Sequence, residues 1–111
     1  MQTIFDNAHS GDTIEFTSKE YKNVSLVVNK KVNIVSNKGS VVYASDKVSD
    51  KAKTLGIDKT FGFYFTSKSA GSVLSGITIK ASNSDYAIIV NGTNNVAINN
   101  NKIIGATNCV L

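Results

Sequence analysis

Few side chains in this sequence could act as a nucleophile, a general base or a metal ligand. His9 is the only histidine, Cys109 is the only cysteine, and eight acidic residues are scattered through 111 positions. A glycosidase needs two carboxylates that converge on one face, and a calcium site needs a similar cluster of oxygen ligands. The spacing of the acids matches neither pattern. The sequence therefore predicts no catalytic residue, no metal site and no cofactor.

The two singular residues have structural explanations. His9 follows a predicted short helix and lies close to Asp12 in the sequence. A lone histidine there usually helps to satisfy the last helical carbonyls. Cys109 adjoins Val110 and Leu111, which predicts a buried or edge thiol, because no basic partner is visible. A single cysteine allows no intrachain disulfide and leaves the redox compartment open.

Aromatic residues concentrate in the segment Phe61-Gly62-Phe63-Tyr64-Phe65. Strict alternation along a strand places the three phenylalanines on one face and Tyr64 on the other. The phenylalanines are expected to stack in the core. An exposed Tyr64 beside a protruding loop could instead support a stacked sugar ring, so Tyr64 is the candidate ligand-binding residue.

Asparagine is abundant and carries two further predictions. Asn23-Val24-Ser25 and Asn91-Gly92-Thr93 match the acceptor triplet for N-glycosylation, which makes Asn23 and Asn91 candidate glycan carriers. A chain rich in Asn and Thr also produces such triplets by chance. The asparagine clusters are expected at turns, where stacked amides can exchange hydrogen bonds and tolerate left-handed backbone.

Composition bounds the class of protein. Apolar residues make up 41% and charged residues 18%, which fits a folded domain and not a disordered chain. The net charge of +4 comes from twelve lysines without one arginine, and it is spread along the chain. Without a basic stripe or arginine forks we expect no nucleic-acid partner. No apolar run is long enough to span a membrane, and no signal peptide is visible. We therefore expect the chain to be either cytosolic or a piece of a longer exported protein.

Short alternating strands separated by polar turns dominate the sequence. Residues 2–9 predict a helix that places Ile4, Phe5 and Ala8 on one face. Residues 45–56 predict a second short helix in a protruding loop, with Ser45 able to cap it and Gly56 able to end it. The strands are expected around residues 14–16, 24–28, 32–34, 41–43, 61–65, 77–79, 88–90 and 96–98.

The last third of the chain repeats itself. Residues 74–79 align with residues 98–103 at an offset of 24, and an offset of 23 aligns Tyr86 with Cys109. Three short strands and their turns fit within one period. This is the length of one coil of a parallel β-helix, in which each coil stacks on the next and buries a ladder of Val, Ile and Leu.

Two phrases carry a family resemblance: Asp6-Asn7-Ala8-His9-Ser10-Gly11-Asp12-Thr13-Ile14 and Leu74-Ser75-Gly76-Ile77-Thr78-Ile79. They resemble the right-handed parallel β-helix, pectate-lyase-like repeats of adhesin-like surface proteins of methanogenic archaea. There a capping helix ending in A-x-x-G-D-T-I precedes coils with I-S-G-N-T-I phrases. The resemblance implies a cell-surface setting and adhesion. Carbohydrate-active relatives use acidic clusters with an Arg or Lys base, which this chain does not match, so no catalytic residue is carried over.

We therefore expect an all-β fold: a right-handed parallel β-helix of about four coils of 23–24 residues, forming a single domain over residues 1–111. A short N-terminal capping helix (2–9) and a helical loop insertion (45–56) complete it. A β-sandwich of short strands is the structural alternative. The segment is expected to be the N-terminal fragment of a longer solenoid.

The expected function is a non-catalytic, adhesin-like module that binds glycans, a cell-wall polymer or neighbouring cells. A polysaccharide lyase or hydrolase of the same fold, or a purely structural stalk, are the alternatives. An open C-terminal coil predicts pairing with another copy, because a solenoid that stops in mid-coil leaves strand edges unpaired.

Overall fold

Short parallel strands form most of the structure. The computed structural model describes residues 1–105 and the backbone of residues 108–110. Sheet A contains β1 (Thr13–Glu15), β4 (Asn33–Val35), β7 (Ser72–Ser75) and β10 (Val96–Asn99). Sheet B contains β2 (Glu20–Val24), β5 (Val41–Ala44), β8 (Thr78–Lys80) and β11 (Lys102–Ile104). Sheet C contains β3 (Leu26–Val28), β6 (Phe61–Phe65), β9 (Tyr86–Val90) and β12 (Asn108–Val110). The helical elements are α1 (Gln2–Asn7), α2 (Asp50–Thr54) and the 3₁₀ turn η1 (Ser67–Ser69).

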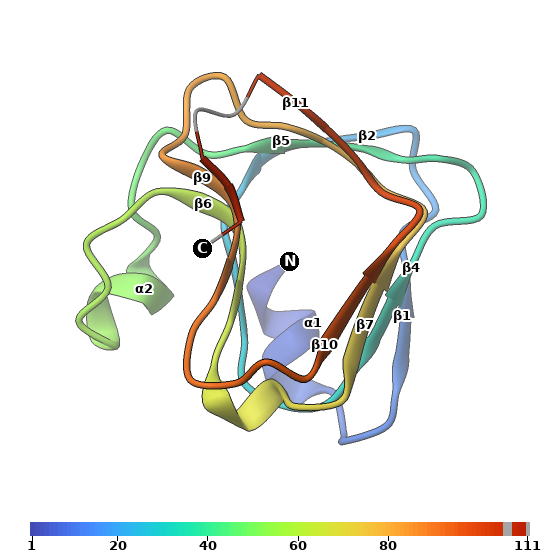
Figure 1. Cartoon of the computed structure of the whole chain (residues 1–111), viewed down its shortest axis with the longest axis vertical. Coiled ribbons are helices and arrows are strands. Elements are labelled where there is room, and N and C mark those ends of the chain that lie inside the picture. Colours follow the sequence, from blue (N-terminus) through green and yellow to red (C-terminus); the bar gives the residue numbers. More distant parts are fainter. Residues whose placement is uncertain (106–107, 111) are drawn as a thin grey trace.

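Each sheet takes every third strand of the chain. The backbone passes through sheets A, B and C in turn and then returns to A, so that the three sheets surround a common interior (Figure 1). All strand pairings among the described residues are parallel. A sandwich built from antiparallel sheets is therefore wrong. The mostly-β architecture with three parallel sheets is compatible with a β-helix-like fold.

The strand register confirms one of the two predicted offsets. Ile98 pairs with Leu74 in sheet A and Ile103 with Ile79 in sheet B, both 24 residues apart. In sheet C, however, Asn108 and not Cys109 pairs with Tyr86. The offset of 23 is therefore wrong, because the connection between β11 and β12 is shorter than the one between β8 and β9. The predicted burial of the Cys109 side chain falls outside the described residues.

The interior is filled by inward side chains from all three sheets. Ile34, Leu74, Val42, Ile79 and Phe63 are fully buried and belong to one hydrophobic cluster. Ile34 pairs in register with Leu74, and Val42 pairs with Ile79, so these four residues form ladders across neighbouring strands. Burial of these apolar side chains is the largest favourable contribution to folding.

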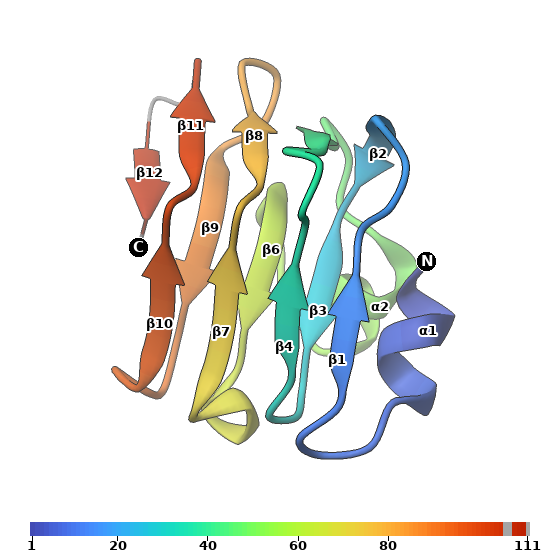
Figure 2. The same cartoon turned by 90° about the vertical axis from the view of Figure 1, so that its right-hand side faces the viewer.

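Helix α1 lies at one end of the molecule, beside β1 and β3 (Figure 2). Phe5 enters the core, whereas Ile4 remains 59% exposed. The predicted apolar face is thus wrong for Ile4, and the helix ends at Asn7, earlier than expected. Helix α1 has only six residues, less than two turns, and Phe5 is its one buried side chain.

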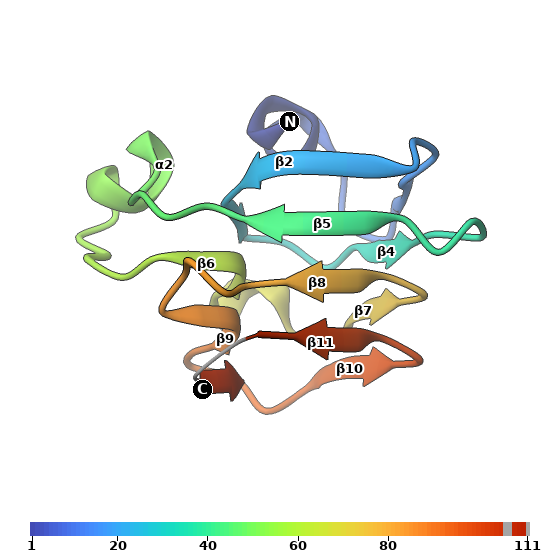
Figure 3. The same cartoon turned by 90° about the horizontal axis from the view of Figure 1, so that it is seen from above.

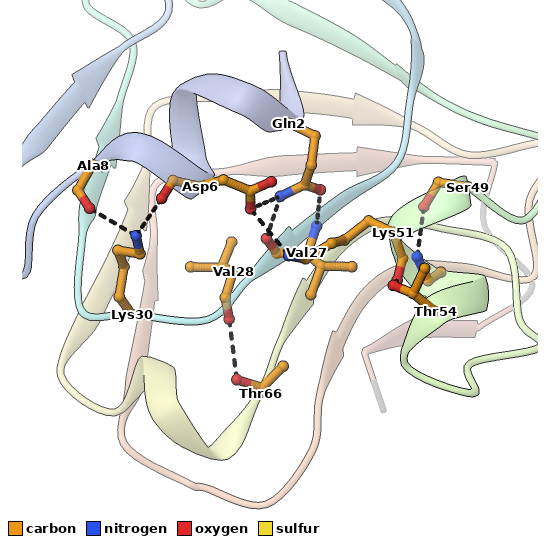
Figure 4. A network of polar contacts seen from close by, with 11 residues as sticks. Gln2, Asp6, Ala8, Val27, Val28, Lys30, Ser49, Lys51, Thr54 and Thr66 are labelled. Atoms are coloured by element: carbon orange, nitrogen blue, oxygen red, sulfur yellow. Dashed lines mark hydrogen bonds and ion pairs between the residues drawn. The ribbon is translucent and has the colours of Figure 1, made fainter.

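Polar contacts fasten α1 to the edge of sheet C (Figure 4). The Gln2 side chain behaves like a strand backbone: its Nε2 donates to Val27 O and its Oε1 accepts from Val27 N, both at 2.8 Å. Asp6 forms an ion pair with Lys51 of α2 at 3.5 Å. The amide of Gln2 therefore satisfies backbone groups of the edge strand β3 that would otherwise be free to pair with another chain.

The end of α1 is satisfied by a lysine and not by the histidine. Lys30 Nζ donates to Asp6 O and Ala8 O, both at 2.7 Å. The His9 side chain is 92% exposed, and its Nδ1 lies 3.9 Å from Asp12 Oδ2. The predicted capping role of His9 is therefore wrong, because the longer Lys30 side chain reaches the last carbonyls from the neighbouring turn of the chain.

The protruding segment contains the predicted helix, but it starts later. Ser49 caps α2 by accepting a hydrogen bond from Ala52 N, and Gly56 follows the helix with φ +74°. Ser45, the predicted cap, accepts instead from Lys47 N, which makes a local turn.

No helix in the part of the chain that the structure describes has the length and apolar character to cross a membrane.

Candidate functional site

The outer face of sheet C is apolar and covered. Val27, Tyr64 and Ile89 are register partners on β3, β6 and β9, and they point away from the main core. They form a second hydrophobic cluster with Phe61 and with Ala52 of α2. Residues 45–60, here named the covering loop, lie over this face. A strand buried on both faces has a continuous apolar sequence, and β6, which is buried at every position, has such a sequence.

Strict alternation breaks within β6. The prediction that Phe61 points into the main core is therefore wrong. A Cβ placed on Gly62 would lie 3.4 Å from Ala44 Cβ and 3.5 Å from Ile79 Cγ2, both of which belong to the main core. Gly62 and Phe63 thus face inward in succession. Phe61 consequently faces outward, with its ring centroid 5.3 Å from that of Tyr64. Phe63 and Phe65 point into the core, as predicted.

Tyr64 points outward, as predicted, but it is not exposed. Its relative exposure is only 9%, because the covering loop and Phe61 pack on its ring. The predicted open platform for a stacked sugar ring is therefore wrong. Asn91 Nδ2 donates a hydrogen bond of 2.8 Å to the Tyr64 hydroxyl oxygen. What Tyr64 can offer a ligand is its hydroxyl end.

Two hollows border this pair at the rim of the covering loop. Their volumes are about 370 and 300 Å³. Tyr64, Asn91, Leu55 and Ile57 line both hollows. The larger one adds Asn29, Thr66, Ser67, Lys68 and Gly92, and the smaller one adds Gly56, Asp58, Lys59 and Ile89. We name the two together the rim site.

The rim site combines hydroxyl and amide groups with an apolar edge. Asn29, Thr66 and Asn91 can exchange hydrogen bonds with a polar ligand. Leu55, 47% exposed, supplies an apolar surface beside them. Asp58 is the one carboxylate that lines either hollow, so the rim site does not hold the two acids that glycoside hydrolysis requires. Its chemistry fits binding of a polyhydroxylated molecule.

The two candidate glycan acceptors lie in different surroundings. Asn91 is exposed, but its Nδ2 is engaged with Tyr64, so a glycan there would stand over the rim site. Asn23 is exposed on β2 with φ +56°. It lies at a bulge, where the register shifts between Tyr21 and Val24. The structure leaves both acceptor predictions untested.

The predicted asparagine contacts between turns occur in a different form. Asn101 Nδ2 donates to Leu74 O at 2.8 Å, and Asn101 Oδ1 accepts from Ile77 N at 3.0 Å. The partners are thus backbone groups of the preceding turn and not a second asparagine. Asn100 adopts left-handed backbone with φ +56°, as expected for this residue type in a tight turn.

Two tyrosines outside the rim site have shifted pKa values. Burial alone would raise the pKa of Tyr21, but hydrogen bonds donated by the backbone amides of Ser18 and Thr17 outweigh it and lower the pKa. The Tyr43 hydroxyl donates to Glu20 Oε2 at 2.8 Å, which raises the pKa of Tyr43.

Sequence reasoning missed the cover over sheet C, although a signal for it existed. Leu26-Val27-Val28 and Ala87-Ile88-Ile89 are continuous apolar segments, and such segments predict strands buried on both faces. Nothing in the sequence marked Asn91 as the hydrogen-bond partner of Tyr64, since 27 residues separate them.

No group of three or more His, Cys, Asp or Glu side chains within the described residues is placed to hold a metal ion. Neither a family model, nor a curated protein, nor a solved structure matches this chain.

Proposed function

We propose that this chain is a non-catalytic binding module of an adhesin-like surface protein, and that it binds glycans at the rim site. The scaffold of this proposal is a right-handed parallel β-helix. Strands taken in the cyclic order A, B, C and registers 24 residues apart support a stack of coils. Parallel strands in one sheet are nearly always joined by right-handed crossovers, which supports the handedness.

The observation that carries the binding function is the contact between Asn91 Nδ2 and the Tyr64 hydroxyl between two hollows. That hydroxyl accepts from Asn91, so its own proton remains for a ligand oxygen. Surrounding amides and hydroxyls suit sugar hydroxyl groups, and Leu55 with Ile57 suits the apolar face of a sugar ring. A cell-surface setting rests on the sequence resemblance.

Two alternatives have weaker support. A polysaccharide lyase or hydrolase would need converging acids, and Asp58 lines the smaller hollow without a second carboxylate. A purely structural stalk would not need the hollows beside the hydrogen-bonded pair Tyr64 and Asn91. The stalk becomes the better description if the rim site binds no glycan.

A glycan array probed with the purified chain, with and without calcium, tests the proposal. Tyr64→Phe keeps the buried ring and removes the hydroxyl, so it should weaken binding about 3- to 10-fold. Asn91→Ala should weaken binding similarly. Asn94→Ala is the matched control, because Asn94 is exposed in the same turn and lines neither hollow.

Three outcomes contradict the proposal. Binding that is equal in the Tyr64, Asn91 and Asn94 variants would move the site away from the rim. Absence of any glycan binding would favour the stalk. Release of unsaturated or reducing ends from polygalacturonate would establish an enzyme.

A further inference from the structure

The three outer faces of the stack differ in charge. Sheet A presents Glu15 and no lysine at the outward positions of its strands. Sheet C is covered by the covering loop. Sheet B presents Lys22, Lys80 and Lys102 outward, against the single acid Glu20. The outer face of sheet B, here named the lysine face, is therefore the cationic side of the stack.

Tyr43 organises the lysine face. It pairs in register with Lys80, and Lys22 lies at the bulge of the neighbouring strand β2. Lys22 Nζ is 5.8 Å and Lys80 Nζ is 5.5 Å from the centroid of the Tyr43 ring. An ammonium group near an aromatic face is held there by cation–π attraction. The two cations are thus kept close to one ring.

The acid on this face is already engaged. Glu20 Oε2 accepts the hydrogen bond of the Tyr43 hydroxyl at 2.8 Å. Lys22 and Lys80 have no carboxylate at ion-pair distance among the described residues. Their charge is therefore available to an anionic ligand from solution.

A hollow of about 280 Å³ adjoins Lys22 and Tyr43, the ring that also holds Lys80. Lys22, Asn23, Tyr43, Ala44, Asp46 and Asn83 line it. The amides of Asn23 and Asn83 can pair with hydroxyl groups, whereas Asp46 disfavours an anion at its own end of the hollow. A ligand that combines spaced negative charges with hydroxyl groups matches this lining better than a compact anion does.

The geometry points to a sulfated polysaccharide laid across the strands of the lysine face. Figure 3 looks onto the outer side of sheet B, where β2, β5, β8 and β11 lie side by side, and neighbouring strands are about 4.8 Å apart. Lys22, Lys80 and Lys102 lie on three of these four strands, with Lys102 in register with Thr78, two residues before Lys80. A linear polyanion can contact all three. Lysine ammonium groups act as compact point charges, whereas an arginine fork pairs bidentately with carboxylates and phosphates, and this chain has no arginine. The lysine face therefore offers separate point charges, which suit sulfate groups spaced along a polymer. The inference is independent of the rim site.

Binding of dextran sulfate, compared with neutral dextran of the same length, tests the inference at low and physiological salt. Dextran sulfate should bind and weaken with salt, and dextran should not bind. The double variant Lys22→Gln/Lys80→Gln should lose at least 10-fold in affinity. The matched control Lys31→Gln/Lys53→Gln removes the same charge from exposed lysines elsewhere and should lose less than 2-fold.

A gain-of-function variant keeps the test informative if the double variant folds poorly. Glu20→Gln removes the one acid of the lysine face and should tighten dextran sulfate several-fold. Equal losses in both lysine pairs would show that only net charge matters, which overturns the site. Tighter binding of inorganic polyphosphate would indicate a phosphate polymer as the ligand, and equal binding of polygalacturonate would remove the preference for sulfate. Either result overturns the assignment.

Discussion

Replacing Gln2 by Glu tests whether the Gln2 amide satisfies the backbone groups of Val27 on the edge strand β3 of sheet C. In the native chain, Gln2 Nε2 donates to Val27 O at 2.8 Å and to Asp6 Oδ1 at 3.1 Å. Glutamate has the same size and keeps the acceptor that Val27 N uses. It places a carboxylate oxygen where the donor was. That oxygen then faces two other oxygens.

The expected loss follows from these contacts. One partly buried and one exposed hydrogen bond disappear, at about 0.5–1.5 kcal/mol each, and the partly exposed site screens the added repulsion. We expect Gln2→Glu to lower the free energy of unfolding by about 1–3 kcal/mol at pH 7. The facing oxygens raise the pKa of the new carboxyl in the folded state above its unfolded value. Its protonated form is therefore favoured by folding, and the deficit should shrink as the pH falls from about 6 to 4.

Urea unfolding measures the free energy of unfolding, and hydrogen exchange at the Val27 amide measures local opening at the edge of sheet C. Exchange is needed because α1 can open locally without unfolding the strands. The control is the same substitution in an Asp6→Asn background, where the repulsion from Asp6 is absent and the deficit should be smaller. A deficit that does not change between pH 7 and pH 4, or no deficit at all, would refute the idea that Gln2 mimics a paired strand.

Three further changes probe other parts of the stack. Gly62→Ala should cost about 1–3 kcal/mol in a denaturant titration, because the new Cβ would lie 2.9 Å from a backbone carbonyl oxygen of β9; an unchanged midpoint would contradict this. Ile89→Ala should cost about 2–4 kcal/mol and speed tryptic cleavage of the covering loop, since it removes a side chain buried beneath that loop. In an ultraviolet titration, the Tyr21 pKa should lie below the ordinary phenol value and the Tyr43 pKa above it. The stabilising contact of the protonated Tyr43 hydroxyl should therefore be lost as the pH rises through the pKa of Tyr43 in the folded state. Glu20→Gln should lower the Tyr43 pKa, and an unchanged titration curve would exclude the assigned hydrogen bond as its cause.

Periodicity in the sequence was enough to predict most of the strands, the parallel sheets and an offset of 24, whereas β7 and β11 were not among the predicted strands. Period-2 alternation marked Ile34 and Ile79, which lie in the core, because inward positions of such strands are mostly apolar. The offset of 23 failed where a polar turn changed length, since turns tolerate such changes and no apolar pattern reports them.

The candidate site was predicted only in part, because its burial depends on contacts between distant segments. Tyr64 was correctly placed outside the main core, but no local pattern shows that residues 45–60 fold back over it. Phe61 failed for a related reason. Gly62 has no side chain, so it can occupy an inward position next to Phe63, and simple alternation does not represent two successive inward residues.

The covering loop determines which changes affect stability and which affect binding. On sheet C the outward residues Val27, Tyr64 and Ile89 are buried, so substitutions there change the free energy of unfolding as well as the shape of the rim site. On sheet B the outward residues remain open to solvent, and substitutions such as Lys22→Gln remove charge without opening a cavity. A conservative change like Tyr64→Phe is therefore required at the rim site, whereas charge removal is sufficient on the lysine face. The two proposed sites can fail separately, because they lie on different sheets and use different chemistry.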